Sequence, residues 1–403
     1  MEERRLVLAL SATTTVGYGV LFYAYGVLLL PMERDLGWSR SVLTGAFSLA
    51  LLVAALLTIP VGRWLDRHPP RTLLTAGAVV ACVLGGAWSQ VRDPAVLFVV
   101  WVGLGACMAL LFYEPAFTII TKRLRGSARH RAVTQVTLVA GLASTIFGPL
   151  TSALESALGW RGAVVVLAAL LGIVTVPLFW LALRPPTDAP ELVLDHDDTL
   201  PRDAMASPQF WMLTGAYLLS AFVTYAIGVH LVAYLQGEGW RSGHAAVALG
   251  SVGLLQVIGR SGFARLAERR DAGALGTWVL GVKGIGIAAL VVSPTLVGVA
   301  VFLVLYGAAN GLQTLTRATV IADLYGTAHY GAISAVVSSV SAIAGSTAPF
   351  AMSGAIELVG HDEPVLWGLV GLSLVSAALN ELAIRSASGG VPGTPRPAPS
   401  RSG

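Results

Sequence analysis

The chain has 403 residues, of which 55% are hydrophobic and 12% are charged, with a formal net charge of +4 at pH 7. A soluble domain carries about 25% charged residues, and a mean hydropathy of +0.74 implies more apolar surface than a soluble chain of this length can bury. A lipid bilayer solvates such surface, so the composition predicts a polytopic integral membrane protein and excludes a soluble domain. The sequence pI of about 9.2 does not indicate nucleic-acid binding, because the basic residues are scattered between apolar runs. The two cysteines, Cys82 and Cys107, lie inside apolar runs, so we expect no disulfide framework and no Cys-rich metal site. We also expect no other metal site and no cofactor.

Twelve apolar runs are long enough to cross a bilayer core of about 30 Å as helices. They cover residues 6–31, 41–63, 72–90, 95–121, 131–152, 160–184, 209–236, 243–263, 272–292, 295–322, 331–356 and 364–386. The first run is too long for a signal-peptide core and lacks a small-residue cleavage site, so we expect a retained helix. An even number of crossings places both termini on one side of the membrane.

The distribution of basic residues predicts which side that is. The N-terminus and the even-numbered loops hold fifteen Lys and Arg residues, and the odd-numbered loops hold five. The positive-inside rule then places both termini in the cytoplasm, in a plasma (inner) membrane.

The chain repeats itself in the same direction, and the clearest copy is the turn Gly62–Arg71, GRWLDRHPPR. A shift of 202 places Arg63 on Arg265, Asp66 on Glu268, Arg67 on Arg269, Tyr23 on Tyr225, Gly37-Trp38 on Gly239-Trp240 and Gly105 on Gly307; a shift of 200 places Pro149 on Pro349. The repeat predicts an all-α membrane fold of two pseudo-symmetric six-helix bundles. The predicted domains are residues 1–184 and 209–386, joined by a cytoplasmic linker at 185–208 that is rich in proline and acid, and followed by a disordered tail at 387–403.

Twelve apolar helices in two parallel halves, with G-x-x-x-D-R-x-x-x-R after the second helix, resemble a major facilitator superfamily transporter. Gly62, Asp66, Arg67 and Arg71 match that signature, and the second copy departs from it at Ala264 and Glu268. The resemblance implies a cytoplasmic gate, in which this turn and its copy hold one side closed as a reversible latch. Its residues would be Gly62, Asp66, Arg67, Arg71, Arg265, Glu268 and Arg269. The alternative is a turn that only anchors a loop at the anionic lipid surface.

Within this superfamily, the Gly-Trp-Ser-Arg entry to the second helix and Gly259-Arg260 late in the eighth are similar to the monocarboxylate and oxalate/formate transporter branch. The resemblance implies that Arg260 binds a substrate carboxylate, for which a planar donor fork is suited. The alternative is that Arg260 snorkels to the lipid headgroups.

Two more ionisable residues occupy predicted cavity helices. Glu114 lies in the fourth helix, where Pro115 should bend the chain, and Pro115 falls on Arg317 of the tenth at the shift of 202. The resemblance implies that helices 1, 4, 7 and 10 line the cavity. A low-dielectric cavity favours a protonated carboxyl group and an approaching arginine favours the carboxylate, so Glu114 and Arg317 are a candidate proton-coupling or gating pair, or else a static structural pair. Lys283, in the peripheral ninth helix, is expected to support the fold or to snorkel.

Neutral polar residues could supply further hydrogen bonds in the cavity. Tyr23, Tyr225, Gln256 and Asn310 complete the predicted substrate site with Arg260 and Arg317. Tyr18, Tyr25, Tyr113 and Gln313 are weaker candidates. We expect His230 to be a hydrogen-bonded structural histidine, and the alternative is that it titrates during the transport cycle.

These residues predict a secondary transporter of a small organic anion, a monocarboxylate, that works as a monomer by alternating access and symport with protons. No nucleotide-binding loop is present, so ATP is not the energy source. One alternative is proton-driven efflux of drugs or amphipathic toxic compounds, although Trp101 stands where such exporters often place an arginine. Another is a non-transporting sensor or scaffold. The helices hold no catalytic constellation, so we do not expect an enzyme.

Overall fold

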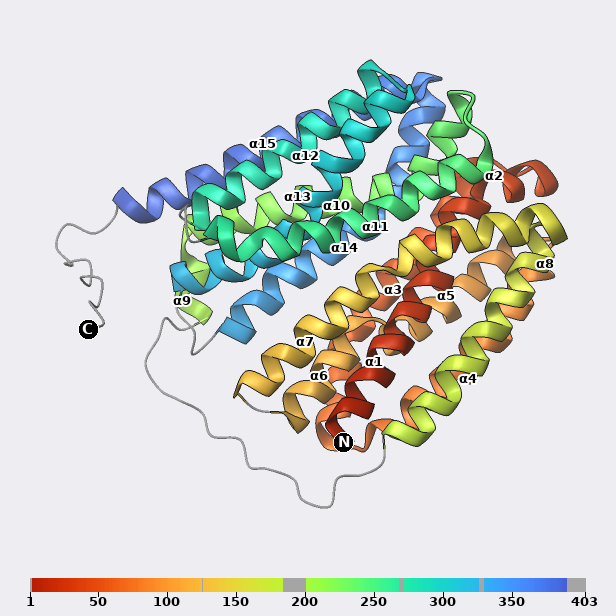
Figure 1. Cartoon of the computed structure of the whole chain (residues 1–403), viewed down its shortest axis with the longest axis horizontal. Coiled ribbons are helices and arrows are strands. Elements are labelled where there is room, and N and C mark those ends of the chain that lie inside the picture. Colours follow the sequence, from red (N-terminus) through yellow and green to blue (C-terminus); the bar gives the residue numbers. More distant parts are fainter. Residues whose placement is uncertain (1, 125, 184–200, 268–271, 326–329, 390–403) are drawn as a thin grey trace.

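The computed structural model describes residues 2–124, 126–183, 201–267, 272–325 and 330–389. Within these ranges the chain is helical and contains no strand. Figure 1 shows two bundles of helices lying side by side, one built from the first half of the chain and one from the second. The predicted all-α fold is confirmed.

The first half contributes six crossings, several of them interrupted. In chain order its helices are α1 (Glu2–Tyr18), a π-helical turn (Gly19–Tyr23), α2 (Ala24–Leu36), α3 (Arg40–Arg67), α4 (Pro70–Ser89), α5 (Pro94–Leu111), α6 (Tyr113–Arg123), α7 (Gly126–Gly141) and α8 (Ala143–Ala182). The second half contains α9 (Pro201–Ala206), α10 (Pro208–Gly237), α11 (Ser242–Ala267), α12 (Ala272–Val292), α13 (Leu296–Tyr325), α14 (Tyr330–Val359) and α15 (Asp362–Gly389). Ser39, Asp93 and Ser207 cap α3, α5 and α10 through their side chains, which satisfies backbone N–H groups that a helix start leaves unpaired.

Eleven spans among the described residues are long and apolar enough to cross a membrane. One of them, Arg131–Ala182, has 52 residues and would be about 78 Å long as a continuous helix, more than twice the bilayer core. Gly159 breaks it with φ 69° and ψ 168°, a backbone conformation that L-residues with side chains avoid. The 52-residue span therefore makes two crossings, and the total is the predicted twelve.

The internal repeat is visible in the turns. Gly37 and Gly239, 202 positions apart, have φ values of 66° and 86°. Gly159 and Gly360, 201 positions apart, have φ values of 69° and 83°. The same left-handed turns end equivalent helices in both halves, at positions where a side chain would be strained.

The repeat is visible in helix packing too. A Cβ atom on Gly105 of α5 would overlap the carbonyl oxygen of Ala50 in α3, and one on Gly307 of α13 would lie 3.3 Å from the carbonyl oxygen of Val252 in α11. Val252 is Ala50 shifted by 202. Equivalent helices thus pack at equivalent backbone atoms.

Two boundaries differ from the sequence-based prediction. Residues 184–200 lie outside the described part, but Pro201–Ala206, placed in the linker by prediction, form α9. Ala204 is 2% exposed, because the apolar side chains of α9 pack on α10. The Trp211 indole nitrogen also donates to the carbonyl oxygen of Met205 at 2.9 Å, so α9 is fixed to the second bundle. Similarly, α15 continues to Gly389, past the predicted tail start at 387.

The two ends of the bundles are distinguishable. Glu2 in α1 and the last turn of α15 lie at the same end in Figure 1, which we call the inner end; the end carrying the glycine turns is the outer end. Large apolar side chains face outward around the bundles, among them Leu56, Val99, Ile173, Trp278 and Leu296. This apolar belt is the surface that a bilayer solvates.

Candidate functional site

A cavity of about 320 Å³ lies between the two halves. Its lining comes from the first crossing, α6, α7, α10, α11 and α13. Six residues selected from the sequence line it together: Tyr23, Tyr225, Gln256, Arg260, Asn310 and Arg317. Tyr25 does not: it is fully buried, and its ring stacks on Phe47 at 4.3 Å within the first bundle.

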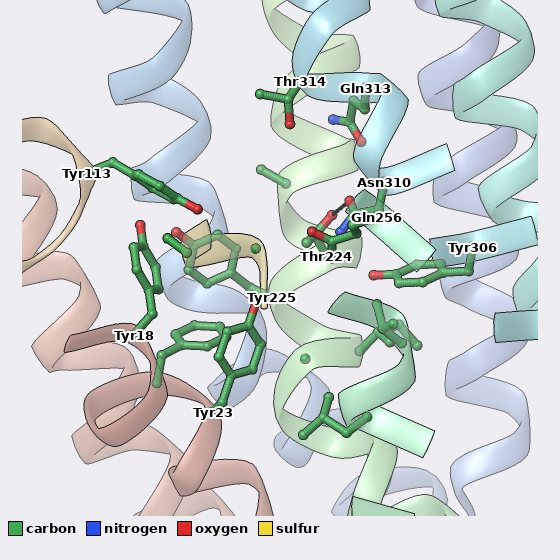
Figure 2. A pocket seen from close by; sticks show the side chains of 18 of the residues that line it. Tyr18, Tyr23, Tyr113, Thr224, Tyr225, Gln256, Tyr306, Asn310, Gln313 and Thr314 are labelled. Atoms are coloured by element: carbon green, nitrogen blue, oxygen red, sulfur yellow. Dashed lines mark hydrogen bonds between the residues drawn. The ribbon is translucent and has the colours of Figure 1, made fainter. Parts of the chain in front are cut away.

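The first half supplies an aromatic wall, made of Tyr18, Phe22, Tyr23 and Tyr113. Tyr18 stacks on Phe112 with ring centroids 3.9 Å apart, and the Phe22 ring meets the Tyr225 ring edge-on at 5.4 Å. Figure 2 shows the labelled tyrosines turned toward the space between the halves. This wall suits the apolar or planar body of a ligand.

Interruptions in two helices position the residues of the aromatic wall. The π-helical turn Gly19–Tyr23 carries Phe22 and Tyr23, and π-turns often mark functional sites. The fourth crossing breaks at Phe112, where φ is −86° and ψ is −162°, so that Tyr113 starts α6. Pro115 cannot donate to the Leu111 carbonyl, which explains a bend here. The predicted bend at Pro115 is confirmed, but the π-turn was missed.

The second half supplies a polar wall, made of Thr224, Gln256, Asn310 and Gln313. The Thr224 hydroxyl lies 3.3 Å from Asn310 Oδ1. Thr224 and Tyr306 also line the cavity but were not predicted. Tyr306 could have been found, because Tyr306, Asn310, Gln313 and Arg317 recur at the spacing of one helix face.

Arg260 reaches across the interface rather than toward lipid. Its Nη1 donates to the carbonyl oxygen of Thr137 in α7 at 2.7 Å. Its positive charge interacts electrostatically with the hydroxyl groups of Tyr23 and Tyr113. Its Nε is buried without a hydrogen-bond partner. The headgroup-snorkelling alternative is thus wrong, and a planar cation borders the cavity.

Glu114 lies beside this site but does not line it. It sits in the first turn of α6, where free backbone N–H groups favour a negative charge, and its side chain is exposed. Glu114 interacts electrostatically with Arg317, Tyr18 and Tyr225. No direct ion pair joins Glu114 to Arg317 among the described residues, so the two groups interact only at longer range.

Lys283 points inward from α12 and is 1% exposed. Its Nζ lies 2.7 Å from Thr224 Oγ1 and 2.8 Å from Gln313 Oε1. Of the two roles expected for it, snorkelling is wrong, because its ammonium group is held inside the second bundle directly behind the polar wall; support of the fold remains.

The signature turn ends α3 at the inner end. The Arg71 guanidinium lies 3.6 Å from the centroid of the Trp180 ring, and Lys122 Nζ donates to the Leu65 carbonyl at 2.7 Å. Gly62 is partly buried and Arg67 is exposed. Glu268, Arg269 and the side chains of Asp66 and Arg265 lie outside the described residues, so the latch stays a prediction.

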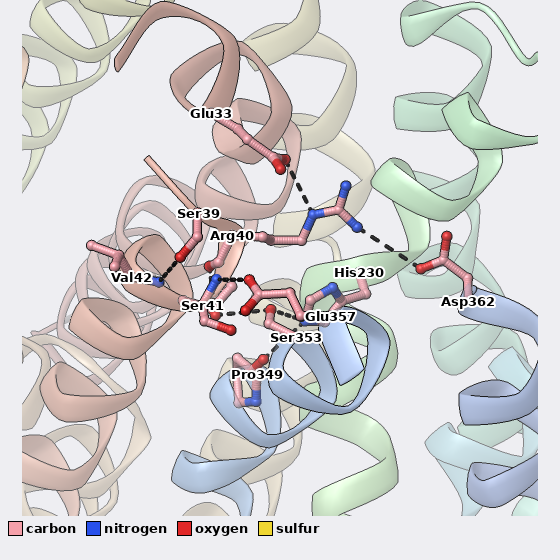
Figure 3. A network of polar contacts seen from close by, with 11 residues as sticks. Glu33, Ser39, Arg40, Ser41, Val42, His230, Pro349, Ser353, Glu357 and Asp362 are labelled. Carbon is pink, nitrogen blue, oxygen red and sulfur yellow. Dashed lines mark hydrogen bonds and ion pairs between the residues drawn. The ribbon is translucent and has the colours of Figure 1, made fainter. Parts of the chain in front are cut away.

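At the outer end, polar contacts join the two halves (Figure 3). Arg40 pairs with Glu33 of its own half at 3.1 Å and with Asp362 of the other at 3.8 Å. The backbone N–H of Ser41, in the first turn of α3, donates to Glu357 Oε1 at 2.9 Å. These contacts hold the outer ends of the halves together.

Below these pairs the interface is buried. Thr44 Oγ1 donates to Ser353 Oγ at 2.9 Å, and the Phe350 N–H donates to Ser48 Oγ at 3.1 Å. His230 is buried, with Nε2 3.0 Å from the Pro349 carbonyl oxygen, as expected of a structural histidine.

A second contact between the halves is made by α8 and α11. The Thr145 hydroxyl donates to the Gly250 carbonyl at 2.6 Å, and a Cβ on Gly148 would lie 2.9 Å from the Ala246 carbonyl oxygen. Small residues let these backbones approach closely, as in other membrane helix pairs.

Comparisons with known proteins agree with this architecture. The family model described as "Major Facilitator Superfamily" matches residues 10–349. A comparison with curated protein sequences finds no match. Among solved structures, a bacterial homologue of the human lysosomal transporter Spinster, in an inward-facing and unoccupied conformation, aligns with a TM-score of 0.75 at 18% identity, covering 96% of this chain and 98% of that one. A bacterial homologue of Spinster in an inward-facing and occupied conformation aligns with a TM-score of 0.73 at 17% identity, covering 94% of this chain and 96% of that one. The chain therefore belongs to the Major Facilitator Superfamily and is a membrane transporter.

Proposed function

We propose that this transporter moves a small organic anion, a monocarboxylate with an apolar or aromatic body, together with protons. One observation carries the proposal: among the described residues that line the cavity, the charged ones are Arg260 and Arg317, and no acid lines it. A cavity with two guanidinium groups attracts an anion and repels an organic cation. The aromatic wall opposite them fits the body of the acid.

The two arginines are suited to different parts of the task. Arg260 donates to the Thr137 carbonyl and is thereby held in place across the interface. Arg317 has no hydrogen-bond partner among the described residues, and its charge acts on Glu114. Arg260 therefore provides a fixed carboxylate site, and Arg317 is free to turn between the substrate and Glu114.

Loss of either arginine should weaken transport of acids. We expect Arg260→Ala and Arg317→Ala each to raise the KM for benzoate and lactate about 10- to 100-fold, because each removes a charge-assisted hydrogen bond. Counterflow of labelled acids in proteoliposomes measures this. Arg241→Ala is the matched control, since Arg241 is exposed in the connection before α11, and its KM should equal that of the native protein.

The same experiment separates the rivals. An efflux protein for amphipathic cations would exchange labelled tetraphenylphosphonium and keep that activity in Arg260→Ala. A sensor or scaffold would exchange nothing in any variant. Normal benzoate transport by Arg260→Ala would refute the anion site.

Glu114 is the proposed proton carrier. Arg317 favours the Glu114 carboxylate when it is close, and substrate that draws Arg317 away favours the protonated acid. Glu114→Gln should therefore abolish accumulation driven by an inward proton gradient while leaving counterflow within about twofold of native, since exchange needs no net proton transfer.

Glu238→Gln, which neutralises an exposed acid at the end of α10, is the control and should accumulate substrate normally. Gradient-driven accumulation by Glu114→Gln at the native level would exclude Glu114 as the carrier.

Orientation and assembly complete the proposal. The excess of basic residues in the even-numbered loops supports an inner end that faces the cytoplasm of a plasma (inner) membrane, with the signature turn as a cytoplasmic gate. Because the cavity is lined from both halves of a single chain, a monomer suffices for transport.

A further inference from the structure

Lys283 is a buried cation that the proposed transport cycle does not use. Its Nζ lies among five acceptor atoms on α10 and α13: Thr224 Oγ1 at 2.7 Å, Gln313 Oε1 at 2.8 Å, Ser220 Oγ at 2.9 Å, Asn310 Oδ1 at 3.3 Å and the Ser220 carbonyl at 3.4 Å. The Tyr306 ring centroid lies 5.5 Å away. No acidic side chain pairs with it among the described residues.

The Lys283 ammonium group determines which end of a neighbouring side-chain amide faces it. It has three protons and no lone pair, so an amide in contact with it must present its oxygen. The two hydroxyl groups reinforce this choice, because Ser220 Oγ donates to Gln313 Oε1 at 2.9 Å and Thr224 Oγ1 approaches Asn310 Oδ1 at 3.3 Å. The oxygens of Asn310 and Gln313 are therefore committed to the Lys283 side.

The amide nitrogens of Asn310 and Gln313 are left for the cavity. Both residues line it, and neither nitrogen has a hydrogen-bond partner among the described residues or is sealed from the cavity. In Figure 2 the nitrogen of Gln313 is turned toward the side where Tyr113 and Tyr225 lie. With its oxygens occupied, this part of the polar wall offers only donors.

The charge of Lys283 also favours an anion in the cavity. Burying an ammonium group among neutral acceptors is costly, and that cost falls when an anion enters a cavity one amide group away. When Lys283 is protonated, Arg260, Arg317 and Lys283 present three positive charges to the ligand from α11, α13 and α12.

We propose that Lys283 is a positioning residue that holds the Asn310 and Gln313 amides with their NH₂ groups toward the cavity, which makes the polar wall a donor surface for a second oxygen-bearing group of an anionic substrate. The proposal rests on the proposed anion transport. It specifies the substrate class further: a carboxylate with another acceptor, such as a hydroxy, keto or second carboxylate group, bound between the arginines and the amides.

The first test needs no ligand and uses thermal unfolding of the purified full-length protein. Gln313→Glu keeps an oxygen toward Lys283 and adds an ion pair, so it should shift the melting temperature upward in the native background. In the Lys283→Met background the same change should shift it downward, or less upward, because the carboxylate loses that partner. Equal shifts in both backgrounds would overturn the positioning role. If Lys283→Met does not fold, Lys283→Gln takes its place in the cycle.

The second test compares salicylate, an acid with a second acceptor, with benzoate, an acid that lacks it. Lys283→Met should weaken salicylate binding about tenfold, because the amide donors lose their orientation and the anion loses a nearby positive charge, and it should weaken benzoate binding by a smaller factor. Gln313→Leu should weaken salicylate binding to a similar extent and leave benzoate binding unchanged, and the double variant should lose little more than Lys283→Met. Native salicylate binding by Lys283→Met, or equal losses for the two acids, would refute the inference while anion transport stands. A native protein that binds neither acid would instead refute anion transport, and the unfolding cycle would still decide the role of Lys283.

Discussion

A disulfide between Thr44→Cys and Ser353→Cys should stop transport, and a reductant should restore it. The two side-chain oxygens are 2.9 Å apart across the halves, so the replacing sulfur atoms are within bonding reach. Alternating access requires the outer ends to separate, and a covalent bond between α3 and α14 prevents this. We expect counterflow to be lost after copper-phenanthroline oxidation and to return with dithiothreitol, in a background where Cys82 and Cys107 are alanine.

The controls for this lock are the two single-cysteine variants, which should transport equally before and after oxidation. Labelling of free thiols with a polymer-bearing maleimide shows how much protein is cross-linked, so that activity can be plotted against that fraction. Native transport by fully cross-linked protein would mean that the outer ends do not part at this contact. The cycle would then need a different moving element.

The architecture was largely predictable, because the thickness of a bilayer sets the length of each helix and the sequence repeat indicates that the two halves have the same arrangement. Runs of about 20 apolar residues and a shift of 202 are enough to predict twelve crossings in two bundles. The equivalent turn glycines Gly37 and Gly239 show why the shift survives in the sequence: both positions need a backbone that other residues adopt only with strain. The π-helical turn Gly19–Tyr23 was not predictable, because its apolar residues fit an α-helix equally well.

The cavity residues were predictable to the extent that polar side chains are rare in the apolar runs. Arg260 and Arg317 stand out there, and the structure brings both to one cavity. Lys283 stands out equally, yet the direction of its side chain depends on partners in α10 and α13 that are distant in sequence. Position in a peripheral helix misled the interpretation, because a long side chain can reach past its own helix into the neighbouring ones.

Gly105→Ala should destabilise the protein by about 3 kcal/mol, the upper range for overpacking. A Cβ atom at Gly105 overlaps the Ala50 carbonyl oxygen, and backbone atoms cannot rotate away as a side chain can. The helices α3 and α5 would have to move apart, which would also displace α6 with Tyr113 and Glu114. Thermal unfolding of detergent-purified protein, followed by size-exclusion chromatography, should show a lower melting temperature and a smaller folded fraction.

Gly86→Ala is the matched control, because no atom lies within 4 Å of a Cβ at Gly86 in the adjacent helix α4. The same substitution there removes a flexible residue from a helix interior and should stabilise by up to about 1 kcal/mol. Gly307→Ala should resemble Gly105→Ala, since its Cβ would lie 2.7 Å from Leu255 Cβ and 3.3 Å from the Val252 carbonyl. If Gly105→Ala and Gly86→Ala were equally stable, close backbone contact between α3 and α5 would not be what holds the first bundle together. The paired response of Gly105 and Gly307 therefore tests the repeat itself, because one packing rule is expected to govern both halves.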